Sequence, residues 1–406
     1  MDCCARMRGR PLVDALPIWT RAIGGRLFTR RSSSLRLGLC RPSSEFQGLS
    51  RFHASNNFVH HRLPSIVTCA STESNEYEYR SVGTPLELFT PGGKFLCCIL
   101  KDQPHIFQAA ATKQLEELSF ERDSAFARWE HSKGSSESSL HGRIAEMKER
   151  ECRLAVEEVM YLLIVHSFSK INVPMVPNLS KCLNNGRLEL WSSKDKELES
   201  LHGIELAEMV REHLSNVLRL QGKSDSTGNW TTIKIERLQL GRLYAASIMY
   251  GYFLKSVSLR HKLELSLSLR NDDIFGDQMM RPLLPHFQQQ EHENLVALGC
   301  SLGEASSLYP AAQRSKADKL RGYMMTFDSN TLRLCAKLRS FEAANLIENH
   351  SWALFGDLES GLLNKDEVVA VQVSGFKRLI LEAVAFGTSL WDVEWFVDSR
   401  FCLKSS

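Results

Sequence analysis

The stretch GRLYAASIMYGYFLKSV, residues 241–257, is the most apolar long segment of the chain. Its apolar run extends from Leu243 to Leu254 and ends at Lys255. A helix that crosses a bilayer needs about 20 predominantly apolar residues, so this run is too short for a membrane span, and so is every other run in the sequence. A helix that is apolar on nearly every side is typically buried inside a protein. The segment therefore predicts the central wall of a folded domain.

The pattern around this segment recurs later in the chain. Residues 201–213 (LHGIELAEMVREH) align with residues 338–350 (LRSFEAANLIENH) at an offset of 137. Residues 233–257 then align with residues 369–393 at an offset of 136, with Gly251 matching Gly387. Two blocks in the same order predict an internally duplicated unit.

Each predicted unit consists of a helix, a short strand and a longer helix. TTIKIE and VVAVQV alternate apolar and polar residues as half-buried strands do. The helices that follow contain Gly251 and Gly387, and a glycine inside a helix suggests that two backbones approach closely there. We expect a mainly α fold with a few short strands, of the α+β class.

The first unit contains a predicted helical hairpin that the second lacks. One helix begins near Pro104, SKGSSESS (132–139) forms a turn, and a second helix runs from about Leu140 to His166. Its apolar stripe consists of Leu140, Ile144, Met147, Val159, Leu162 and Leu163. The stripe lies opposite a densely charged face. Such a face usually meets solvent, and docking of a partner is the alternative.

The N-terminus differs in composition from the rest of the chain. Residues 1–70 hold eleven Arg, no Lys and three acids, a net charge of +8. Basic, Ser-rich and acid-poor composition is typical of organellar transit peptides. We predict a disordered chloroplast transit peptide over residues 1–69, cut between Cys69 and Ala70, and an acidic linker over residues 70–83. A mitochondrial presequence and a basic nucleic-acid-binding tail are the alternatives.

The remaining residues carry 39 basic and 44 acidic side chains, a net charge of −5, which disfavours binding to nucleic-acid phosphates. Their seven cysteines contain no C-x-x-C spacing, so we expect free thiols. We expect the pair Cys97–Cys98 to be buried and to pack as small hydrophobic side chains, with redox sensing as the alternative. The predicted units span residues 84–270 and 318–404, joined by a flexible linker over residues 271–317.

Two patterns could carry chemistry. GCSLG (299–303) matches the G-x-S-x-G nucleophile motif and makes Ser301 a candidate catalytic residue. His350 is the only histidine after Ser301, and no alternating βα pattern precedes the motif, so a hydrolase is disfavoured. Candidate metal ligands recur at matching positions of the two units. They are Glu205, His213, Glu342 and His350. The helix dipole alone, however, favours a Glu near the start and a His near the end of a helix. We expect no cofactor.

Four segments resemble a family of unknown function, family 760, which occurs in plant chloroplasts and cyanobacteria and has plant members named for induction by UV-B. They are residues 84–118, 143–165, 244–257 and 379–401. The chain departs from the family pattern at Ser256, Ser258 and His261, where the family has Arg, Asp and Phe. The resemblance implies a location in the chloroplast stroma and a role in stress, and it supplies no catalytic residues.

These observations favour a non-enzymatic protein that binds other proteins, or complexes at a membrane surface, during light or oxidative stress. An enzyme that uses Ser301 and a helical carrier of an apolar ligand or pigment are the alternatives.

Overall fold

A computed structural model describes residues 84–184, 186–188, 190, 194–222, 231–272, 309–356 and 367–405. Within these ranges the chain forms ten α-helices, a short 3-10 helix and four strands. The first half contains α2 (Pro91–Asp102), α3 (Phe107–His131), α4 (Ser138–Lys170), η3 (Leu179–Lys181), β1 (Leu183–Asn184), β2 (Arg187–Leu188) and α5 (Asp195–Ser200). The remainder contains α6 (Ile204–Leu220), β3 (Thr232–Glu236), α7 (Arg237–Asp272), α8 (Tyr309–Met325), α9 (Ser329–Ala336), α10 (Phe341–Phe355), β4 (Val368–Gln372) and α11 (Val373–Phe401).

The predicted fold class is confirmed: the described residues are mainly helical and hold one small sheet. The strand order is β1-β2-β4-β3, in which β3 and β4 are antiparallel and β2 is parallel to β4. The alternation of apolar residues along β3 places Ile233 and Ile235 in the core. None of the described helices is both long enough and apolar enough to span a membrane.

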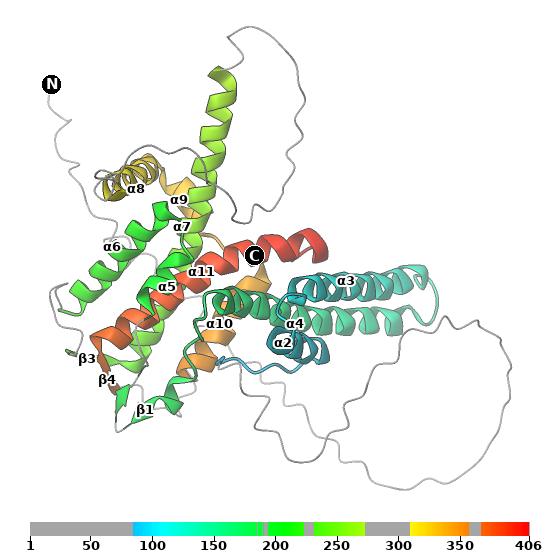
Figure 1. Ribbon diagram of the computed structural model, residues 1–406. Helices are drawn as coiled ribbons and strands as arrows, with labels where there is room; N and C mark the ends of the chain where they lie inside the picture. The colour runs from blue at the N-terminus through cyan, green and yellow to red at the C-terminus, as the bar shows by residue number, and fades with distance from the viewer. Residues whose placement is uncertain are drawn as a thin grey trace, which may run out of the picture.

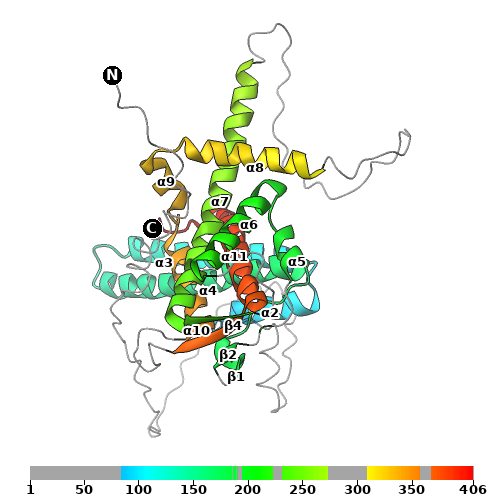
Figure 2. The same ribbon diagram turned by 90° about the vertical axis from the view of Figure 1, so that its left-hand side faces the viewer.

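The order of helix, strand and longer helix occurs twice, as α6-β3-α7 and as α10-β4-α11. The two strands pair so that Lys234 lies opposite Ala370, its counterpart at the offset of 136. Each strand leads directly into its long helix, and α7 crosses α11 in the centre of the molecule (Figures 1 and 2).

The crossing of α7 and α11 depends on two glycines. A Cβ atom at Gly251 would lie 2.1 Å from the carbonyl oxygen of Val384, and one at Gly387 would lie 1.9 Å from that of Ile248. Val384 is itself the counterpart of Ile248, so the two contacts mirror each other. The predicted close approach of backbones at the matching glycines is confirmed, as is the burial of both helices around them.

The hairpin of α3 and α4 is also confirmed, and it projects from the body (Figure 1). Its middle part is held to the C-terminal segment, residues 401–404. Arg122 on α3 donates to the carbonyl oxygen of Phe401 at 2.5 Å, and Lys404 forms an ion pair with Glu149 on α4.

Three features differ from the sequence-based expectation. Residues 309–317, which we assigned to the linker, form the start of α8. Residues 91–102 form the helix α2, where we expected no helix. The predicted stripe of α4 is buried only in its C-terminal half, because the N-terminal half extends beyond the body.

Candidate functional site

A buried polar network lies where α7, α10 and α11 meet. Glu382 on α11 is fully buried; it accepts hydrogen bonds from the amide of Val176, at 3.1 Å, and from Arg378, at 3.2 Å. Tyr244 on α7 bonds to Glu382, and its hydroxyl lies 3.0 Å from Nε2 of His350 on α10. Burial raises the pKa of Glu382 to about 7 and lowers that of His350 to about 3, so the histidine is neutral at physiological pH.

The two candidate histidines occupy equivalent environments. His213 stacks on Tyr250 with ring centroids 4.2 Å apart, and His350 stacks on Phe386, the counterpart of Tyr250, at 4.4 Å. Nε2 of His213 lies 3.1 Å from the hydroxyl oxygen of Ser247. Burial lowers the pKa of His213 to about 4. Both rings therefore pack as neutral core groups.

The glutamates of the candidate metal sets point to other partners. Glu205 lies 3.8 Å from Lys262, and Glu342 lies 3.4 Å from Arg153. Each glutamate is eight residues from its histidine, a rise of about 12 Å along a helix. Among the described residues no group of three or more His, Cys, Asp or Glu could hold a metal ion. Ligation by these residues stays a prediction that the geometry does not favour.

Other predicted sites fall partly or wholly outside the described residues. Ser301, Cys69 and Ala70 lie outside them. Cys97 is buried, which raises its thiol pKa and disfavours the reactive thiolate, whereas Cys98 is partly exposed.

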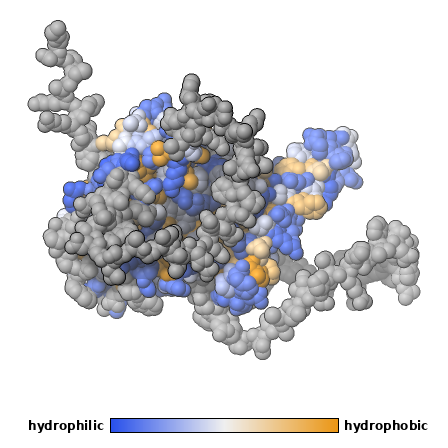
Figure 3. Space-filling model, turned by 45° about the horizontal axis from the view of Figure 1, so that its top comes forward, coloured by the Kyte–Doolittle hydropathy of each residue, from blue (hydrophilic) through white to orange (hydrophobic). Residues whose placement is uncertain are grey.

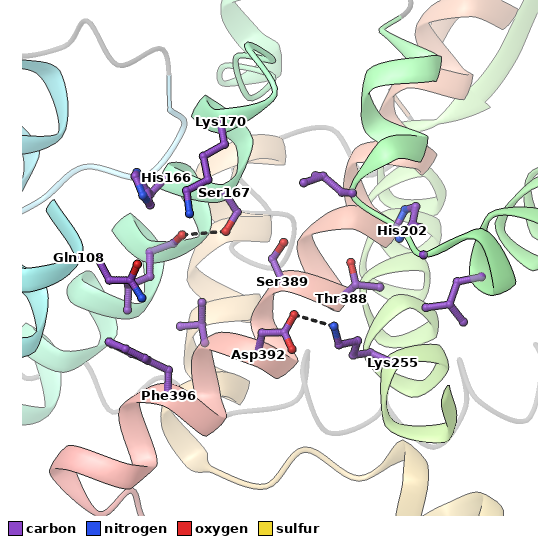
Figure 4. Close-up of a pocket in the computed structure, with 15 residues that line it drawn as sticks. Gln108, His166, Ser167, Lys170, His202, Lys255, Thr388, Ser389, Asp392 and Phe396 are labelled. Atoms are coloured by element: carbon purple, nitrogen blue, oxygen red, sulfur yellow. Dashed lines mark hydrogen bonds and ion pairs between the residues drawn. The ribbon is translucent and has the colours of Figure 1, made fainter. Parts of the chain in front are cut away.

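The structure contains a cavity of about 300 Å³ between α3, α4, α7, α11 and the N-terminus of α6 (Figure 4). Its lining is rich in polar and basic side chains. These are Gln108, His166, Ser167, Lys170, His202, Lys255, Thr388, Ser389 and Asp392. Lys255 and Asp392 form an ion pair at 2.8 Å. The other side chains of the lining are apolar and belong to Leu163, Leu201, Leu206, Val393 and Phe396. The cavity therefore combines an apolar wall with several polar and charged groups, as small-molecule sites do.

His202 is the most unusual group in this lining. It is 94% buried, and within the described part of the chain neither ring nitrogen has a hydrogen-bond partner. Burial and, to a smaller extent, the charge of Lys255 lower its pKa to about 4. A buried polar group without a partner destabilises the fold by about 1–3 kcal/mol, so this ring is a candidate ligand contact.

A second candidate site is the exposed face of α4 near the tip of the hairpin, which we call the hairpin surface. It consists of Leu140, Ile144, Met147 and Leu154, flanked by Arg143 and Arg150. The four apolar side chains are 60%, 38%, 52% and 58% exposed, respectively. Hydrophobic residues are visible on this projection among polar ones (Figure 3). Both arginines are exposed, and the described residues provide neither with an ion-pair partner.

Sequence reasoning identified the α4 stripe but not the cavity. The cavity residues come from five separate elements, and no short motif links them. The sequence signal for the cavity was the repeat. It places Gly203 in the first unit at the position where the second unit has Ser340.

Comparisons with known proteins identify a family and a relative. Residues 139–267 match the family described as "Protein of unknown function (DUF760)". The chain is 36% identical over 390 residues to a chloroplastic protein of Arabidopsis thaliana named as UV-B-induced, and the alignment covers 92% of this chain and 91% of that one. No solved structure matches.

Proposed function

The chain belongs to the DUF760 family, and from this premise we propose that it is a chloroplast stromal protein that acts by binding another protein during the response to UV-B or oxidative stress. The name of its Arabidopsis relative supports the location and the inducing signal. The N-terminal composition, typical of a transit peptide, supports import into the chloroplast. Catalysis is not part of this proposal.

The observation that carries the binding proposal is the hairpin surface. Leu140, Ile144, Met147 and Leu154 fall within an arc of about 80° on α4 and extend along about 21 Å of its axis. Farther along α4 the same face is covered, because Glu158 accepts hydrogen bonds from the amides of Phe89 and Thr90 next to α2. The exposed part is therefore a helix face that lacks a covering element within the described residues.

The charges beside this stripe indicate the chemistry of the partner. Arg143 and Arg150 are seven residues apart and lie on one flank of the stripe. Glu151, within the stripe, forms an ion pair with Lys148 at 3.6 Å. A second copy packed antiparallel about Met147 would bring Arg143 opposite Arg150, which like-charge repulsion disfavours. We therefore assign the partner as a helix with an apolar ridge and carboxylates on one side.

We also infer that the two units arose by duplication. Three features support this inference. Lys234 pairs with its counterpart Ala370, the glycine contacts of α7 and α11 are reciprocal, and His213 and its counterpart His350 stack on aromatic rings at matching positions.

Affinity capture from chloroplast extracts tests the binding proposal. We expect Leu140→Ser/Leu154→Ser and Arg143→Glu/Arg150→Glu each to lose the same partner by at least about tenfold, which is about 1.4 kcal/mol. Lys133→Glu, at the nearby hairpin turn, is a single charge-reversal control and should retain that partner.

The identity of the captured protein then provides the stricter test. Reversal of its acidic residues to lysine should restore binding to the Arg143→Glu/Arg150→Glu variant. Capture that neither double variant reduces, or self-association of the chain through Met147 in sedimentation experiments, would contradict the proposal.

A further inference from the structure

The N-termini of α6 and α10 occupy matching places in the two units, but only that of α10 has a side-chain cap. In α10 the hydroxyl of Ser340 accepts a hydrogen bond from the amide of Ala343, and the buried carboxylate of Glu394 accepts one from the amide of Ser340 at 2.7 Å. A negative charge therefore lies at the positive end of this helix, where the macrodipole favours it.

The first unit lacks both of these groups. Gly203 occupies the place of Ser340 and provides no side-chain cap, and Ser258 stands where the second unit has Glu394. The helical hydrogen bonds of α6 start at the amide of Leu206, which leaves the two preceding amides of the first turn free to bind an acceptor. A helix N-terminus without a cap can bind an anion.

The cavity lies at this uncapped end. Gly203 and Leu206 line it, and His202 immediately precedes them. His202 faces His166 and Lys170 across the cavity (Figure 4). The ring of His202 is almost fully buried and has no hydrogen-bond partner among the described residues, an observation independent of the helix end. Both ring nitrogens are therefore available to a ligand in the cavity.

We propose that this cavity binds a small oxyanion, the phosphate group of a free phosphate ion or of a small phosphate ester, between the N-terminus of α6, His202, Lys170 and Lys255. The oxygens accept hydrogen bonds from the first-turn amides and from the His202 ring. Lys170 and Lys255 supply positive charge. The volume of about 300 Å³ is at the lower end of the range for small-molecule sites, which favours a small ester.

Asp392 sets the strength of this site. It is the one acidic residue among those that line the cavity, and its ion pair with Lys255 offsets one positive charge. The Asp392 side chain is 56% exposed, so its replacement leaves the core intact. Loss of this carboxylate should strengthen anion binding, and loss of Lys255 should weaken it.

Isothermal titration of the full chain with inorganic phosphate, at constant ionic strength set with chloride, tests the proposal. We expect about tenfold weaker binding for Lys255→Met and for Lys170→Met, since each variant loses a charged hydrogen-bond donor. Asp392→Asn should bind more tightly. Lys133→Met removes one charge from a comparable surface ion pair with Glu130 and should bind as the unmodified chain does.

A second readout locates the anion. In nuclear magnetic resonance spectra of the histidine rings, phosphate should raise the pKa of His202, which faces Lys170, Lys255, Asp392 and His166, and leave that of His213 unchanged. A parallel titration with glycerol 3-phosphate separates the sources: tighter binding than inorganic phosphate supports an ester, and equal or weaker binding supports the free ion. Absence of millimolar binding, or binding that Lys255→Met and Asp392→Asn both leave unchanged, would overturn the proposal.

Discussion

Glu382 shows how one residue organises the centre of this fold. Its carboxyl group joins the amide of Val176, the guanidinium group of Arg378 and the hydroxyl group of Tyr244, so segments more than 100 residues apart meet at one group. Arg378 also donates to the carbonyl oxygen of Pro174 at 2.6 Å. Buried polar groups need such a set of partners, because an unmet one costs about 1–3 kcal/mol. The network thereby specifies how α11 packs against the chain that follows α4.

The raised pKa of Glu382 makes a prediction about pH. Its folded-state pKa of about 7 lies above its ordinary value of 4.5, so the native state binds this proton more tightly than the unfolded chain does. The stability that the proton supplies is complete below pH 4.5 and is lost as pH rises through 7. Glu382→Gln cannot titrate.

We therefore expect the free energy of unfolding of Glu382→Gln, relative to the unmodified chain, to rise by roughly 2 kcal/mol between pH 5 and pH 7. Urea denaturation at several pH values measures this difference. Glu117→Gln, at an exposed position on α3, serves as the control and should follow the unmodified chain. A difference for Glu382→Gln that stays constant with pH would show that this carboxyl is not the titrating group.

At the scale of elements, local patterns predicted most of the fold. The alternation in residues 232–236 and 368–372 and the flexible turn at residues 132–139 depend only on neighbouring residues, and the strands and the hairpin occur where we expected them. The helix α2 was missed because it begins with Pro91, Gly92 and Gly93. Its start is held by Glu158, which is 68 residues from Thr90.

The candidate sites were less predictable, because they also depend on contacts between residues far apart in the sequence. The hairpin surface follows one helix and is visible as a stripe in the sequence, although its exposure depends on how far α4 extends beyond the body. The cavity requires α3, α4, α6, α7 and α11 to be assembled first. Neither the burial of His202 nor the ion pair of Lys255 with Asp392 can be derived from residues next to them in the sequence.

The different ends of α6 and α10 lead to a prediction at this scale. Ser340→Ala removes a cap from α10 and should lower the free energy of unfolding by about 1 kcal/mol or more. Gly203→Ser introduces a cap into α6, where a Cβ would meet no atom within 4 Å, and should raise it by a few tenths of a kcal/mol. Thermal and urea denaturation check both. A loss of stability in Gly203→Ser would contradict an uncapped helix end.

At the scale of the whole molecule, the two long helices form the frame on which the other elements are placed. The helices α7 and α11 cross at their glycines, and α6 and α10 pack beside these two helices. The strands β3 and β4, which precede α7 and α11, pair with each other. The hairpin extends from this frame and presents the hairpin surface (Figure 1). The cavity lies between the frame and the hairpin helices α3 and α4. Separate places for partner binding and for an anion are consistent with two independent roles.

The most direct test of this account is the stability of alanine variants at the crossing. Gly251→Ala and Gly387→Ala each force a Cβ against a backbone carbonyl that cannot move aside, so each should lower the free energy of unfolding by about 3 kcal/mol or more. Gly322→Ala, in α8 with no atom near the added Cβ, should raise it by roughly 0.5–1 kcal/mol. If urea denaturation shows that alanine at residues 251 and 387 is tolerated as well as at residue 322, the two helices do not cross backbone to backbone and the account is wrong.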